Sequence, residues 1–309
     1  MPFQLIFKVN IFLGIFLGIC STVCLNTGRG IQRLGADALG KNVLKRYKEE
    51  KSDRKKLNRW LIGTVIITIA SVLQFAAQIF LDRPSTFVAL GGIGIISVVL
   101  FAFFIIREKV TSLQVIGITT MIIGTILLGI DYPELVDKPL PNYSFFIYSA
   151  IFIILGILML IIYKITKKGL GIIFGSISGF FNGFAAIATA FATATGENDI
   201  GASLLNGWFL LSLIVGQGAF WTTQYAFKLG GKASVVVPAM NAFIIVIPLI
   251  LDGLIYQIPF GIFQILAFIL NITGILVLSI ASANVFNKVL IDAETVVEKQ
   301  DKHELEKIE

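Results

Sequence analysis

The sequence predicts an all-α polytopic membrane protein with nine transmembrane helices arranged as an inverted repeat. Three observations support this. Of the 309 residues, 56% are hydrophobic and 14% are charged, with a mean hydropathy of +0.87, which is more apolar surface than a soluble domain of this length can bury. Nine apolar runs are long enough to cross about 30 Å of hydrocarbon. Basic residues gather in alternate connections between these runs.

The expected spans are the apolar runs with almost no charge inside them. They cover residues 9–26, 60–81, 87–106, 112–130, 144–163, 170–194, 207–227, 234–256 and 260–281. The first run follows Lys8, as the apolar part of a signal peptide would, but no A-x-A-like cleavage site follows it. We therefore expect a retained anchor. Residues 1–282 form a single predicted transmembrane domain.

Lysine and arginine set the expected orientation because they are retained on the cytoplasmic side of a membrane. Segment 28–59 holds eleven of them, and every second connection after it is basic. These segments and the tail hold all 25 basic residues except Lys8, Arg83 and Lys138. We therefore expect the N-terminus outside and the C-terminus inside, with 28–59 as a basic cytoplasmic loop and 283–309 as a cytoplasmic charged tail.

A weak internal repeat appears when the chain is shifted by 150 residues. The shift aligns residues 112–130 with 262–280, matching Gln114 with Gln264 and Gly124 with Gly274. Spans two to four then correspond to spans seven to nine, and a separation of five spans gives the copies opposite orientations. Residues 9–130 and 144–281 are the two predicted repeats. Inverted repeats are typical of secondary transporters whose substrate site lies between the copies; pseudo-symmetry without transport is the alternative.

Several chemistries are excluded by residue type. The single histidine, His303, lies in the polar tail, so no histidine metal site or Ser/His/Asp triad is expected in the membrane. No nucleophile with a base and no carboxylate pair lies within the spans, so we expect no enzyme and no cofactor. Cys20 and Cys24 are interpreted as packing residues. The positive charge sets topology, and no nucleic-acid partner is expected.

Polar side chains inside the spans are the default site candidates, because they are costly there unless they face the bundle or a wet cavity. Helical spacing puts Gln74 and Gln78 on one face, and does the same for Gln217, Trp221 and Gln224 on the repeat-equivalent helix. The full set of substrate-binding candidates is Gln74, Gln78, Gln217, Trp221, Gln224, Asn241, Asn182 and Asn26. Asp252 is the candidate metal ligand, or else an acid reaching the outer interface. Helix-joining hydrogen bonds are the alternative role for the amides.

Two short motifs support a family resemblance. Gln74-Phe75-Ala76-Ala77-Gln78 is similar to the second-span core of NIPA-like proteins, the magnesium transporters of the drug/metabolite transporter (DMT/EamA) superfamily, and Glu108 in REKV is similar to their acidic residue after the third span. Residues 59–129 resemble their second to fourth spans, and Pro238 stands at their helix-breaking position. The resemblance covers most of residues 9–281.

This sequence departs from the family pattern at two positions, with Ser71 in place of a glutamate and Ala89 in place of a proline. Magnesium favours carboxylate or carbonyl oxygens and keeps its waters, so without that glutamate amides would have to coordinate through water.

The resemblance implies a multi-pass secondary transporter of the cell membrane that carries magnesium or another divalent cation by alternating access. A DMT-type carrier of a small polar metabolite is the alternative, and a non-transporting scaffold or receptor is the alternative from another class. The expected partners are membrane lipid and the small solute or cation. A homodimer stays open.

Overall fold

A computed structural model describes residues 11–39, 51–80, 84–130, 142–195, 200–256 and 260–281. This part of the chain is almost wholly helical and contains no strand, which agrees with the predicted all-α class. The elements are α1 (Ile11–Gly35), η2 (Ala36–Ala38), α3 (Lys51–Phe80), α4 (Pro84–Phe101), η3 (Ala102–Ile106), α5 (Ser112–Ile130), α6 (Asn142–Thr166), α7 (Leu170–Thr195), α8 (Ile200–Leu204), α9 (Gly207–Lys228), α10 (Ala233–Tyr256) and a last helix, Ile262–Ala281.

Seven of the described helices are long and apolar enough to cross a membrane: α1, α3, α5, α6, α7, α10 and the last helix. Helix α4 and the turn after it contribute a shorter apolar stretch, Leu90–Ile106. Helix α9 is less apolar because it carries several glutamine and threonine side chains. The chain is therefore a multi-pass membrane protein, and the count of nine spans stays a prediction.

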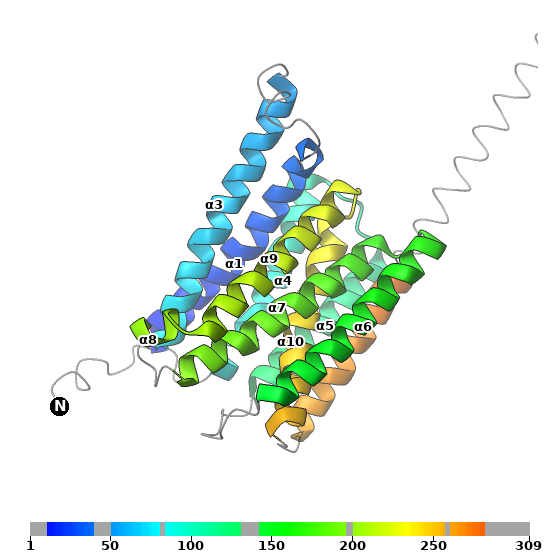
Figure 1. Cartoon of the computed structure of the whole chain (residues 1–309). Coiled ribbons are helices and arrows are strands. Elements are labelled where there is room, and N and C mark those ends of the chain that lie inside the picture. Colours follow the sequence, from blue (N-terminus) through cyan, green and yellow to red (C-terminus); the bar gives the residue numbers. More distant parts are fainter. Residues whose placement is uncertain are drawn as a thin grey trace, which may run out of the picture.

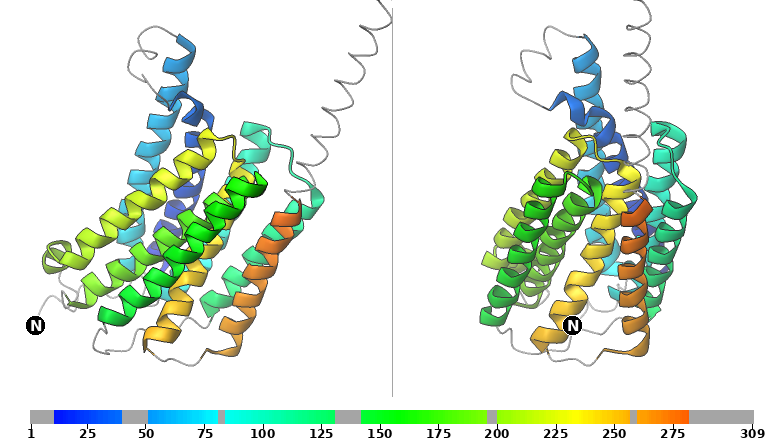
Figure 2. Two further views of the ribbon diagram at one scale, coloured as in Figure 1. Left: turned by 45° about the vertical axis from the view of Figure 1, so that its right-hand side comes forward. Right: turned by 90° about the vertical axis from the view of Figure 1, so that its right-hand side faces the viewer.

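The long helices run side by side in one bundle (Figures 1 and 2). We call α1–α5 the first half and α6 through the last helix the second half. Basic residues lie at one end of the bundle, where α1, α4, α6 and α9 end and where α3 begins; we call this the basic end. Its members include Arg33, Lys51, Arg107, Lys109, Lys164, Lys167, Lys168, Lys228 and Lys232.

Helices α7 and α10 form the centre of the bundle. Glycines recur every fourth residue along α7, at positions 171, 175, 179 and 183, and so lie on one face. That face contacts α10 directly: a Cβ on Gly175 would lie 2.6 Å from the Val236 carbonyl oxygen, and one on Gly183 would lie 2.8 Å from Ile247 Cβ. Glycines permit such an approach because they carry no side chain between the two backbones.

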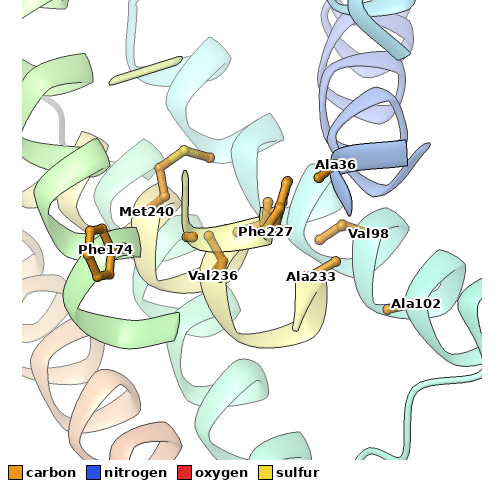
Figure 3. Packing of buried hydrophobic residues seen from close by; sticks show 10 residues of the cluster. Ala36, Val98, Ala102, Phe174, Phe227, Ala233, Val236 and Met240 are labelled. Carbon is orange, nitrogen blue, oxygen red and sulfur yellow. The ribbon is translucent and has the colours of Figure 1, made fainter. Parts of the chain in front are cut away.

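A cluster of buried apolar side chains joins both halves near the basic end (Figure 3). Val98 of α4 and Ala36 of η2 come from the first half, while Phe227 of α9 and Val236 of α10 come from the second. Phe227 and Val236 are fully buried. This packing fixes the polar residues described below on either side of the boundary between the halves.

Helix α5 and the last helix contact each other through small residues. A Cβ on Gly117 would lie 2.8 Å from the Gly274 carbonyl oxygen, and one on Gly124 would lie 3.0 Å from that of Ala267. In the alignment by 150 residues, Gly117 corresponds to Ala267 and Gly124 corresponds to Gly274. The contact of Gly117 with Gly274 is therefore the repeat equivalent of the contact of Ala267 with Gly124. Reciprocal contacts of this type are what a two-fold axis between related surfaces produces.

Two described helices extend beyond the spans expected from hydropathy. Helix α1 continues to Gly35 instead of ending at residue 26, and α3 begins at Lys51 instead of residue 60. Residues 28–35 and 51–59 of the predicted loop are thus helical. Charged residues end an apolar run, but they do not interrupt the backbone hydrogen bonds of a helix. Arg29 and Arg33 therefore lie on a helix. Residues 40–50 and the predicted tail, 283–309, are outside the described residues.

Candidate substrate site

One face of α1 carries polar side chains toward the second half. Asn26, Arg29 and Arg33 follow one another at spacings of three and four residues, so they share a face of the helix. Gly30 lets α4 approach closely beside them, since a Cβ there would lie 2.5 Å from Cδ1 of the Phe101 ring. Gly28 does the same for α3, with a distance of 3.1 Å to the Gly63 carbonyl oxygen. Glycines beside this polar face thus hold α1 against its neighbours.

Asn26 and Arg29 meet Asn241 of α10 inside the bundle. The Asn241 Nδ2 donates to Asn26 Oδ1 at 2.8 Å, and Arg29 Nη1 donates to Asn241 Oδ1 at 3.4 Å. Asn26 Nδ2 donates to the carbonyl oxygen of Thr22, one turn earlier, at 2.9 Å. Asn26 is 3% exposed and Arg29 is 9% exposed. We call Asn26, Arg29 and Asn241 the asparagine–arginine cluster.

The charge of Arg29 is not neutralised within the described residues. Its hydrogen bond to Asn241 is long, and no acidic side chain of the described residues forms an ion pair with it; the neighbouring Arg33, by contrast, pairs with Asp37. An arginine near the centre of a membrane helix costs about 3 kcal/mol on insertion, so such residues usually serve a function. A snorkelling arginine would reach the interface. Arg29 instead bonds to a residue about 12 Å along α10 from Ala233.

Gln224 of α9 lies at the centre of a second polar group. Its Nε2 donates to Gln32 Oε1 of α1 at 2.7 Å, and its Oε1 accepts from Trp60 Nε1 of α3 at 2.7 Å. Gln32 Nε2 donates in turn to Thr64 Oγ1 at 2.9 Å. Gln32 and Gln224 are 1% and 2% exposed. This chain of hydrogen bonds joins the halves about one turn nearer the basic end than the asparagine–arginine cluster.

At the basic end itself, Glu108 caps α10 across the boundary between the halves. Its Oε1 accepts from the backbone N–H of Ala233 at 2.9 Å, and its Oε2 accepts from the N–H and hydroxyl of Ser234 at 3.0 and 2.6 Å. A carboxylate at a helix N-terminus is stabilised by both the free N–H groups and the helix dipole. Beside it, Arg33 Nε donates to the Gly231 carbonyl oxygen at 2.8 Å.

The structure brings together only some of the residues expected at the site. Asn26, Asn241 and Gln224 lie in the two polar groups that join the halves. Gln217 and Trp221 are exposed on the outer face of α9, with Trp221 at 59%. The remaining candidates lie elsewhere or outside the description: Gln74 is half-buried, Asn182 donates to the Ser178 carbonyl oxygen at 3.1 Å, and the side chains of Gln78 and Asp252 are outside the described residues.

Residues of α1 and α3 complete the polar groups without having been expected there. Arg29 and Gln32 were assigned to a topology-setting loop, and Trp60 was the first residue of a span with no role. The signal was present in their spacing, because positions 26, 29 and 33 continue one helical face beyond the predicted end of the span. Glu108 was noted only through the family resemblance.

A groove of about 850 Å³ lies between α6 and α9, and residues of α7 form its floor. Its lining is mostly aromatic and aliphatic, from residues such as Phe152, Phe180 and Ile157. Trp221, Gln224 and Lys228 of α9 line its opposite wall, with Lys228 toward the basic end. An apolar groove of this kind suits lipid better than an ion.

Comparison with known proteins identifies the family. The model of a family described as magnesium transporter NIPA matches residues 9–194, more than half of the chain. The chain belongs to the NIPA family of magnesium transporters. It is also 35% identical over 80 residues to an uncharacterised protein of Methanocaldococcus jannaschii, MJ1333.1, a match covering 26% of this chain and 58% of that protein. No solved structure matches.

The NIPA match covers α1 through α7, which includes Asn26, Arg29, Gln32, Trp60 and Glu108. Membership in a family of transporters agrees with the expectation that the chain is not an enzyme. No group of three or more histidine, cysteine, aspartate or glutamate side chains within the described residues could hold a metal ion. The two polar groups themselves consist of amide side chains together with the Arg29 guanidinium, the Trp60 indole and the Thr64 hydroxyl.

Proposed function

We propose that this NIPA family member is a secondary carrier that moves Mg²⁺ across the membrane by alternating access. In this proposal nine spans form an inverted repeat, the N-terminus is outside and the basic end is cytoplasmic. The exchange of small-residue contacts between α5 and the last helix under a shift of 150 residues supports the repeat. The starts of α5 and of the last helix also support the repeat, because the same type of hydrogen bond caps both. Gln114 Oε1 accepts from the Thr111 N–H, and Gln264 Oε1 accepts from the Gly261 N–H.

The observation that carries the proposal is the position of the hydrogen bonds between the halves. The hydrogen bonds between the halves all lie within about 14 Å of the basic end, measured along their helices. They are the bonds made by Arg33, Glu108, Gln224 and Asn241. Bonds that join two halves near one face of the membrane close that face, and their exchange for others near the opposite face is what alternating access requires. The described arrangement is then the one closed toward the cytoplasm.

Magnesium in such a site keeps its water. The oxygens of Asn26, Gln32, Gln224 and Asn241 already accept hydrogen bonds from protein donors. Mg²⁺ dehydrates reluctantly and commonly retains several waters, so a hydrated ion is the cargo that these amides suit best. A small polar metabolite is the second candidate, favoured by the same amides and by the uncompensated charge of Arg29.

The test is Mg²⁺ flux into proteoliposomes that contain a magnesium-sensitive dye. Wild-type protein should exceed empty vesicles, and Asn241→Ala and Gln224→Ala should each reduce the rate at least tenfold. Gln217→Ala, on the exposed face of the same helix as Gln224, is the matched control and should transport like wild type. Wild-type vesicles no faster than empty ones would refute magnesium carriage, and equal rates for all three variants would refute the site.

A further inference from the structure

Arg29 has more hydrogen-bond donors than the described protein satisfies. A guanidinium carries five N–H groups in a fixed planar fork. The structure gives it one bond, that of Nη1 to Asn241 Oδ1 at 3.4 Å. The other two nitrogens therefore donate to no described protein group.

The Arg29 side chain that carries these donors is not completely enclosed. It is 9% exposed, so about nine-tenths of its surface is buried. The free edge of the fork therefore has unpaired donors within a mostly buried residue, and a small ligand that reaches it would satisfy them.

We propose that Arg29 and Asn241 bind a small oxyanion, with a carboxylate or phosphate group against the free edge of the Arg29 guanidinium. Such groups pair with a guanidinium through two parallel hydrogen bonds. Asn26 holds the Asn241 amide so that its oxygen faces Arg29. The anion supplies the negative charge that a buried guanidinium requires.

This site does not depend on Mg²⁺ carriage and adds a second ligand to it. A bound oxyanion presents oxygen atoms of the type that Mg²⁺ prefers, which the amides lack while they are engaged with protein donors. The same chemistry arises from two sources: an organic or inorganic anion that is itself carried, or a counter-ion that stays bound while the cation moves. Transport assays separate these sources.

Binding is tested by thermal unfolding of the purified full chain in a non-ionic detergent without anionic lipid. Cys20 and Cys24 of α1 are partly buried, so a thiol-reactive fluorophore reports unfolding. Sodium phosphate, sulfate and succinate are compared with sodium chloride at equal ionic strength. At least one of the three should raise the midpoint of wild-type protein by several degrees more than chloride does. The same midpoint in all four salts would overturn the proposal.

Variants locate the response. Arg29→Gln should lose the rise in unfolding midpoint caused by the oxyanion. Arg29→Lys should keep only part of that rise, because an ammonium lacks the planar fork. Lys228→Gln, which removes an exposed charge at the groove, is the matched control and should respond like wild type. If Arg29→Gln does not fold, the lysine variant carries the test: a response equal to wild type would overturn the role of the fork. A response lost in Lys228→Gln and kept in Arg29→Gln would move the site to the surface.

Flux measurements then distinguish the source of the anion and keep this inference separate from the proposed function. Proteoliposomes are loaded with labelled phosphate or succinate, with and without Mg²⁺. Anion movement that requires Arg29 identifies the anion as cargo, and Mg²⁺ movement with a static anion identifies a counter-ion. Absence of Mg²⁺ flux together with the Arg29-dependent thermal response would refute the proposed cation and leave the anion site standing.

Discussion

Replacing Glu108 with glutamine should loosen the closure at the basic end. Glutamine can keep its oxygen where Glu108 Oε2 accepts from Ser234, but its amide nitrogen then faces the Ala233 N–H, which loses its acceptor. Loss of one hydrogen bond to a charged group costs about 1.5–3 kcal/mol, and loss of the negative charge at the start of α10 costs about 0.3–1 kcal/mol more. We expect a total near 2–4 kcal/mol.

This cost falls on the arrangement in which the halves meet at the basic end. If the opposite arrangement separates Glu108 from α10, then about 2 kcal/mol shifts the equilibrium between the two arrangements about 30-fold. Cysteine labelling measures the shift. Val237 of α10 is fully buried near this end, so Val237→Cys, in a chain lacking Cys20 and Cys24, should react with a water-soluble thiol reagent about 30-fold faster when Glu108→Gln is added.

A matched variant makes the comparison quantitative. Ser234→Ala removes only the hydroxyl donor and keeps both backbone bonds to Glu108. Its cost of about 1.5 kcal/mol, the low end of the range for a hydrogen bond to a charged group, should accelerate labelling about tenfold. Labelling at the wild-type rate in both Glu108→Gln and Ser234→Ala would show that the carboxylate does not hold the halves together, and the assignment of closure to the basic end would fail.

Other substitutions test packing and the placement of the amides. Gly274→Ala should destabilise the protein by about 1–3 kcal/mol, because the new methyl group meets the Gly117 carbonyl oxygen at 2.6 Å; Gly216→Ala, with nothing within 4 Å of its new atom, should be neutral in the same thermal unfolding assay. Gln224→Leu should cost about 1–3 kcal/mol, measured by detergent-induced unfolding, because a buried amide and an indole lose their partner; a midpoint like that of wild type would contradict this. Gln217→Leu should change stability by less than about 0.5 kcal/mol, since its side chain is exposed.

The sequence predicted the helical class and the membrane environment well because both depend on composition and on run length. Hydropathy placed the end of α1 wrongly, since it stops at the first charge while the helix continues to Gly35. That error assigned Arg29 and Gln32 to a loop and hid two residues of the candidate site.

Periodicity predicted which residues share a face but not where that face points. Gln217, Trp221 and Gln224 do follow helical spacing, yet the first two are exposed and the third is buried. In a soluble protein the polar side of a helix faces water. In a bilayer lipid tails are as apolar as leucine, so apolar faces occur both inside and outside the bundle. Whether a polar residue is buried or exposed therefore depends on its neighbours in the bundle. For Gln224 these neighbours are Trp60 and Gln32.

The groove between α6 and α9 has a practical consequence. Helix α6 rests on α7 mainly through ring contacts, such as those of Phe152 with Phe180 and of Tyr163 with Phe174, and exposes most of its other side chains. A bilayer leaves no void, so we expect fatty acyl chains to fill the groove and to support α6 on that side. Extraction into short-chain detergent removes this support, and α6 should be the first helix to separate from the bundle. Native-like bilayer discs are therefore the medium in which this membrane protein should best keep its structure.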